Sequence, residues 1–130
     1  MSGDVITLTL PPEREFQRVA HLVLGGLAVR LNLTLEALED LQLALDGLLE
    51  SGSPEHDVTV SLSVLDDSIE ASVGPFAGQK VRRELEADGD GMGLRRVLDT
   101  VVDRVEVSER AGSDWVQLTK RIDSGEAGTA

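Results

Sequence analysis

The residues best suited to chemistry lie in the segment DGDGMGL, where glycines recur at alternate positions before a helical pattern. Gly89, Gly91 and Gly93 would let backbone approach a ligand closely, because glycine has no side-chain carbon. From Leu94 to about Asp103, apolar residues recur at helical spacing. Free N–H groups and the positive end of a helix dipole favour phosphate. The segment is therefore a candidate phosphate site; the alternative is a purely structural entry into the helix.

Two acids on a second expected helix are the other candidates for chemistry. Asp46 and Glu50 are four residues apart, so their carboxylates are neighbours on one face. Such a pair can offer oxygen ligands to magnesium, or one acid can polarise an attacking hydroxyl. Both are candidate catalytic residues, with Glu50 also a candidate metal ligand. The alternative is a solvated helix face.

Other site chemistries find little support in the sequence. His21 and His56 have no third ligand in view, which disfavours a zinc site. No serine has a histidine and an acid arranged as a hydrolase triad. Trp115 is expected to anchor a strand, with partner binding as the alternative, and Lys80, Arg82 and Arg83 are expected to be a solvated charge run or a phosphate contact.

One domain, residues 1–123, is expected to position these residues, because 130 residues at 41% hydrophobic content can bury one core. Residues 124–130 are expected to be a disordered tail. Alternating residues predict strands at 5–10, 58–64, 69–73, 104–109 and 115–122. Helical periodicity predicts helices over 13–31, 35–51 and 94–103, and the charged segment 80–91 is expected to be mobile. This order predicts a two-layer α/β sandwich with a mixed, mainly antiparallel sheet and helices on one face.

The first expected helix, residues 13–31, carries apolar residues around much of its circumference. Its core stripe is expected to be Phe16, Val19, Ala20, Val23, Leu27 and Leu31. Leu22, Leu24 and Val29 fall partly outside that stripe, which favours a second buried face against another subunit. Gly25 and Gly26 either permit close packing or mark a bend.

The charge balance limits the possible partners. Twelve basic and 24 acidic residues give a net charge of −12, which disfavours direct binding to nucleic acid or anionic membranes. The sequence lacks cysteine and any apolar run of about 18 residues, and its start does not resemble a signal peptide. A cytoplasmic protein is expected.

Three segments, in this order, resemble the histidine-kinase-like (GHKL, or Bergerat) ATPases, and more narrowly their anti-sigma-factor serine kinases. They are LQLALDGLLESG, SIEASVGPFAG, and GDGMGLRRVLDTVVDRVEV followed by DWVQLTKRI. The resemblance covers nearly the whole chain and implies a Bergerat-type fold and an ATP or ADP site with magnesium. The positions that align with the family's cofactor-binding residues are Ser51, Gly74, Gly78, Gly89, Gly91, Gly93 and Leu94.

Three positions depart from the family pattern. Gly47 stands where the family has its catalytic glutamate, Ser51 where it has the magnesium-binding asparagine, and Val73 near the adenine-binding aspartate. A positioned acid or base contributes roughly 100- to 10,000-fold in rate, and an unpaired amino donor costs about 1–3 kcal/mol. We expect nucleotide binding and kinase activity to be weak or lost.

The resemblance also implies partners. Members of the family hold a sigma factor inactive as a homodimer and release it to an anti-sigma antagonist of the STAS type. The sequence therefore favours a regulatory protein that keeps partner binding without phosphorylation. The alternatives are an active ATP-dependent serine kinase that phosphorylates a STAS-type antagonist through Asp46 or Glu50, and a scaffold with an unrelated partner.

Overall fold

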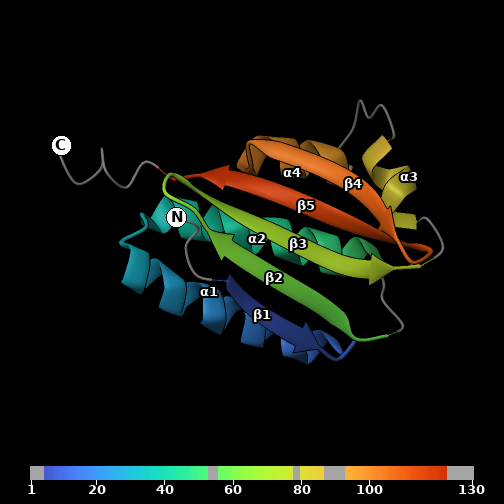
Figure 1. Cartoon of the computed structure of the whole chain (residues 1–130), viewed down its shortest axis with the longest axis horizontal. Coiled ribbons are helices and arrows are strands. Elements are labelled where there is room, and N and C mark those ends of the chain that lie inside the picture. Colours follow the sequence, from blue (N-terminus) through green and yellow to red (C-terminus); the bar gives the residue numbers. More distant parts are fainter. Residues whose placement is uncertain (1–4, 53–55, 78–79, 87–92, 123–130) are drawn as a thin grey trace.

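Five strands form one antiparallel sheet in the order β1-β2-β3-β5-β4, and the helices lie against it (Figure 1). The computed structural model describes residues 5–52, 56–77, 80–86 and 93–122. The elements are β1 (Val5–Leu10), the short 3-10 helix η1 (Arg14–Phe16), α1 (Gln17–Leu31), α2 (Leu35–Gly52), β2 (Val58–Val64), β3 (Ser68–Phe76), α3 (Lys80–Glu86), α4 (Leu94–Val101), β4 (Arg104–Arg110) and β5 (Ser113–Arg121).

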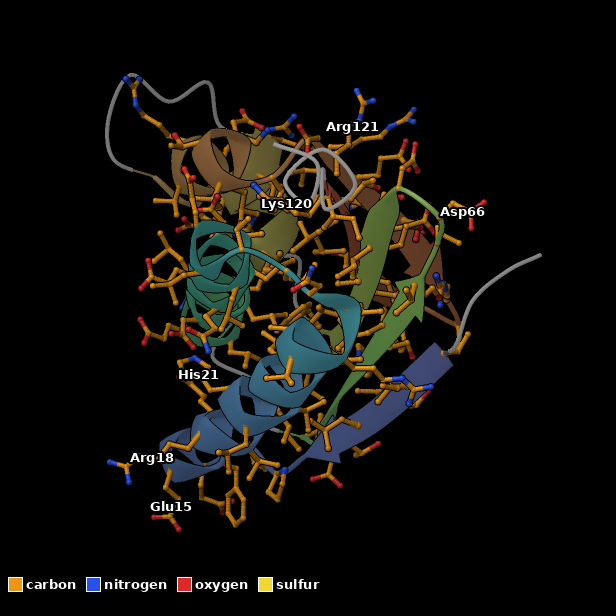
Figure 2. The ribbon with its side chains drawn as sticks, turned by 90° about the vertical axis from the view of Figure 1, so that its left-hand side faces the viewer. Glu15, Arg18, His21, Asp66, Lys120 and Arg121 are labelled. Atoms are coloured by element: carbon orange, nitrogen blue, oxygen red, sulfur yellow. The ribbon has the colours of Figure 1, made fainter. Side chains whose placement is uncertain are left out.

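The sheet has an apolar inner face because alternate side chains of a strand point to opposite sides. The strand register places Val60 opposite Val73 and Val73 opposite Val116, and each of the three is at most 1% exposed. The outer face of the central strands carries polar, uncharged side chains, among them Thr59, Ser61, Ser72, Gln117 and Thr119. Figure 2 shows the helices on one side of the strands only, so the fold has two layers.

Helices α1 and α2 form a hairpin with a short connection. Asn32 adopts a left-handed conformation with φ of 59° and ends α1. The backbone N–H of Ala37 donates to Thr34 Oγ1 at 3.0 Å, so Thr34 caps the N-terminus of α2. Lys120 Nζ on β5 donates to Asp40 Oδ2 of α2 and to the Val101 carbonyl of α4, each at 2.9 Å. This lysine ties the sheet to two helices.

The expected two-layer α/β fold and the order of the expected helices and strands along the chain are confirmed. Each of the four pairings between described strands is antiparallel, so the sheet is less mixed than expected. The stripe expected for the first helix is partly wrong: Leu24 is 1% exposed and lies in the core, while Val23 and Leu31 are only half-buried. Helix α1 is thus turned slightly about its axis relative to the expected stripe.

The expectation of a mobile segment after Gly78 is wrong for residues 80–86. These residues form α3, in which Val81 is 0% and Leu85 2% exposed. Two apolar residues four positions apart are enough to seat a two-turn helix on the core. The rest of the segment, residues 87–92, and the tail from 123 onward lie outside the described residues.

None of the helices in the described part of the chain is long and apolar enough to cross a lipid bilayer.

Candidate functional site

Asp46 lies in the middle of α2 and is engaged by α1. His21 Nε2 and Asp46 Oδ1 are 2.9 Å apart, with both side chains about one-third exposed. The contact joins the two helices of the hairpin and occupies one oxygen of the carboxylate. His21, whose partner could not be predicted from the sequence, therefore has a structural role beside a candidate catalytic acid.

Glu50 and Ser51 lie one turn further along α2. Glu50 is exposed, and the backbone of Ser51 lies in the helix while its side chain is outside the described part. Within the described ranges, no group of three or more His, Cys, Asp or Glu side chains is arranged to hold a metal ion. Catalysis by Asp46 or Glu50 and magnesium binding by Glu50 stay predictions.

Gly47, at the position of the family's glutamate, faces the first residue of α4. A Cβ built on Gly47 would lie 3.2 Å from Leu94 Cδ1, and Leu94 is 5% exposed. The leucine side chain thus lies directly over the position from which a catalytic carboxylate would project. Gly47 itself has no side chain that could orient an attacking hydroxyl.

Val73, near the position of the adenine-binding aspartate, is 0% exposed within the core. Its neighbour Gly74 is covered from the other side of the sheet. A Cβ on Gly74 would lie 2.5 Å from Cδ2 of Trp115 and 2.8 Å from its Cγ. The guanidinium carbon of Arg110 lies 4.7 Å from the centre of the same ring. Gly74 therefore makes room for Trp115.

The glycine-rich turn is described only at its end. Gly78, Gly89 and Gly91 lie outside the described residues, so their cofactor-binding role stays a prediction. Gly93 is the N-cap of α4 in an extended conformation, and its carbonyl accepts from the N–H groups of Arg96 and Val97 at 3.1 and 3.2 Å. A Cβ on Gly93 would meet nothing within 4 Å.

Helix α3 is held against the sheet by an ion pair as well as by its apolar residues. Arg82 Nε and Nη2 donate to Asp114 Oδ1 of β5 at 3.1 and 2.8 Å. This hydrogen-bonded pairing raises the pKa of Arg82 above its usual value. Asp114 is 5% exposed, and its Oδ2 has no hydrogen-bond partner in the described part of the chain. The expected solvated charge run thus contains a residue that fixes α3.

A cavity of about 990 Å³ lies between α3 and α4. Its lining includes Gly93, one of the candidate cofactor-binding residues. It also includes the cations Lys80, Arg83, Arg95 and Arg96. The acids Glu84, Glu86 and Asp99 line it as well, so the cavity carries charges of both signs. Asp46, Gly47, Glu50 and Gly74 are not among its described lining residues. Among the described residues, the cavity therefore brings Gly93 together with cations of α3 and α4, but with neither candidate acid of α2.

No protein-family model matches the chain. Several curated relatives share the name serine-protein kinase RsbW. The relative from Halalkalibacterium halodurans is 27% identical in an alignment that covers 84% of this chain and 78% of the relative. The relative from Bacillus velezensis is 26% identical in an alignment that covers 95% of this chain and 92% of the relative. The relative from Listeria innocua is 31% identical over 77 residues, covering 54% and 49%.

The chain is related to the RsbW serine-protein kinases. The resemblance to the anti-sigma-factor serine kinases of the GHKL family is thereby confirmed. A crystal structure with the RsbU and RsbW domains of a Mycobacterium tuberculosis protein has the same fold, with a TM-score of 0.68 at 16% identity. The match covers 92% of this chain but only 32% of that longer one.

Proposed function

We propose that this RsbW-like chain is an anti-sigma regulator of a bacterial partner-switching system in which nucleotide binding and phosphorylation are weak or lost. It would act in the cytoplasm, binding a sigma factor and a STAS-type antagonist. The observation that carries the proposal is at Gly47, which aligns with the catalytic glutamate: it has no side chain, and Leu94 Cδ1 lies 3.2 Å from where its Cβ would be. The relatives are kinases by name, so the activity would have been lost in this chain.

Two further features support loss of the ATP and magnesium site. Val73 offers no hydrogen-bond acceptor to the adenine amino group, and it is fully buried. Val81 and Leu85 of α3 belong to the same hydrophobic core as Val73 and Leu94. An adenine ring placed against Val73 would therefore have to displace packed side chains, which removes their contacts as well as requiring new ones.

Calorimetric titration of ATP and of ADP, each with magnesium, tests the proposal. We expect no heat of binding up to millimolar nucleotide, and no phosphate transfer to a STAS-type protein. The RsbW kinase from Halalkalibacterium halodurans serves as the positive control in both assays. Micromolar binding that is lost in an Asp46→Ala/Glu50→Ala variant would favour the active kinase instead. A sigma factor or a STAS protein should still bind to the wild-type chain.

We further propose that the chain forms a homodimer through α1 and the edge strand β1. Leu22 is 74% and Val29 85% exposed, and they lie seven residues apart on one face of α1. Between them, Gly25 and Gly26 leave open space above the helix, which suits close approach of a second surface. Val5 on β1 is 62% exposed, and β1 pairs only with β2 among the described strands.

A Leu22→Ser/Val29→Ser variant should weaken this dimer by about 100-fold, because each copy loses two apolar side chains from the interface. Sedimentation velocity over a range of protein concentrations measures the effect. Leu43→Ser is the matched control, since Leu43 is an exposed leucine on α2 instead of α1. A wild-type chain that remains monomeric at high concentration would rule the dimer out.

A further inference from the structure

Helix α2 concentrates acid on its surface. Its 18 residues contain Glu36, Glu39, Asp40, Asp46 and Glu50 but no lysine or arginine. Two of these acids have a described partner on another element: Asp40 bonds to Lys120, and Asp46 bonds to His21. Glu36 and Glu39 are exposed, and within the described part of the chain no cation lies at ion-pair distance from either.

Large apolar side chains flank the two unpaired glutamates. Leu35 is 68% and Leu43 50% exposed. Positions 35, 39 and 43 follow one another at four-residue intervals, so both leucines and Glu39 lie along one face of α2. The leucines are eight residues apart, about 12 Å along the helix axis. Glu36 stands beside Leu35 at the start of the same face. We call Leu35, Glu36, Glu39 and Leu43 the α2 face.

The α2 face is unfavourable for the isolated chain. Glu36 and Glu39 are three residues apart, and like charges at this spacing repel each other by a few tenths of a kcal/mol. The exposed leucine side chains also lack the stabilisation that removal of apolar surface from water would give them. Asp40 and Asp46 show that acids of this helix can find partners within the fold, whereas Glu36 and Glu39 have no ion-pair partner among the described residues.

We propose that the α2 face docks a basic amphipathic helix of a partner protein. Leucine-sized side chains of such a helix would cover Leu35 and Leu43, and lysine or arginine side chains beside them would pair with Glu36 and Glu39. The charge of −12 on the whole chain would also attract a basic segment from a distance. The inference deepens the proposed function, on which it rests for the existence of a protein partner.

This surface differs from the others described above. The proposed dimer face uses Leu22 and Val29 of α1, and the family's catalytic positions begin further along α2, at Gly47. A docked helix on residues 35–43 therefore requires neither nucleotide nor the cavity between α3 and α4. It leaves the proposed dimer contacts of α1 to be tested separately.

The test uses the full-length chain, labelled with ¹⁵N, and a synthetic amphipathic peptide with leucines at helical spacing and lysines elsewhere. Amide shifts should change mainly within residues 35–43. A Glu36→Gln/Glu39→Gln variant should bind the peptide about fivefold to tenfold more weakly, and Leu43→Ser about fivefold more weakly. A second peptide that carries glutamates in place of lysines should not bind.

A matched control separates docking from general attraction between opposite charges. Asp66→Asn/Glu109→Gln removes the same two charges from exposed positions on the sheet side, where Figure 2 places Asp66 far from α2. It should change peptide affinity less than twofold. An equal loss in this control, or shift changes spread over the surface, would overturn the proposal. Far-ultraviolet circular dichroism verifies that each variant is folded.

The same variants distinguish this inference from the proposed function. If a sigma factor binds the wild-type chain and binds the Glu36→Gln/Glu39→Gln variant equally well, docking on the α2 face is wrong and the anti-sigma role stands. If neither a sigma factor nor a STAS protein binds, but the peptide binds with the expected pattern, the proposed anti-sigma role is wrong and the docking surface is supported.

Discussion

Replacing Val73 by aspartate should destabilise the protein by about 3–5 kcal/mol, although it restores the residue type that the family uses to recognise adenine. Val73 is 0% exposed and lies between Val60 and Val116 in the sheet register. An aspartate there would be a buried carboxylate among hydrocarbon side chains. Urea unfolding at pH 7, followed by circular dichroism, measures the loss in the free energy of unfolding.

The loss in Val73→Asp should depend on pH in a definite direction. Burial disfavours the charged form, so the folded-state pKa of the new carboxyl would lie above its unfolded value of about 3.9. Above that unfolded pKa the unfolded state ionises first, and the penalty grows with pH until the folded pKa is reached. The difference between variant and wild type should therefore be about 2–3 kcal/mol smaller at pH 5 than at pH 7.

Ser72→Asp is the matched control for this prediction. Ser72 is the preceding residue of β3, on the outer face of the sheet, and Arg110 Nη2 lies 3.5 Å from its hydroxyl. A carboxylate at this position would be hydrated and close to a cation, so the free energy of unfolding should change by less than about 1 kcal/mol. If instead Val73→Asp were tolerated and bound ATP, a polar adenine site would exist beside β3, and the proposed loss of nucleotide binding would be wrong.

The sequence predicted the elements of this fold because their patterns are regular. Alternation identifies β2 from Val58 to Val64, and the cap at Thr34 marks where α2 begins. Helix α3 was missed because only two of its seven residues, Val81 and Leu85, are buried, and its other positions are mostly charged. A helix of two turns carries too few residues for periodicity to separate it from a loop.

The candidate site was harder to predict because its decisive contacts join segments far apart in the chain. The sequence marks Gly47 as a departure from the family, but not that Leu94, 47 positions later, lies over it. Likewise, the pairing of Arg82 with Asp114 depends on how α3 sits on β5. Residue type gives no signal for either contact, since both depend on tertiary packing. The structure also adds a role for Gly74: the resemblance places it in a nucleotide-binding motif, and in the fold it makes room for the ring of Trp115.

Gly74→Ala should destabilise the protein by about 1–3 kcal/mol and disturb the environment of Trp115. The new methyl group would lie within 2.9 Å of three ring atoms, so the ring must move. That movement would also disturb the stacking of Arg110 on the ring, which is now 4.7 Å from its centre. Since Trp115 is the single tryptophan of the chain, a red shift of its fluorescence reports the displacement directly.

Two further variants show whether the clash with Trp115 is the cause. In a Gly74→Ala background, Trp115→Leu should lower the free energy of unfolding by about 1–2 kcal/mol less than it does in the wild-type chain. The reason is that removing the ring also relieves its clash with the new methyl group. Gly25→Ala is the control for glycine replacement in general: a Cβ there would meet nothing within 4 Å, and alanine favours a helix by up to about 1 kcal/mol. Additive effects of Gly74→Ala and Trp115→Leu would mean that Gly74 is not needed to seat the ring. The place of Gly74 in the family's nucleotide-binding motif would then be the remaining explanation for a glycine at this position.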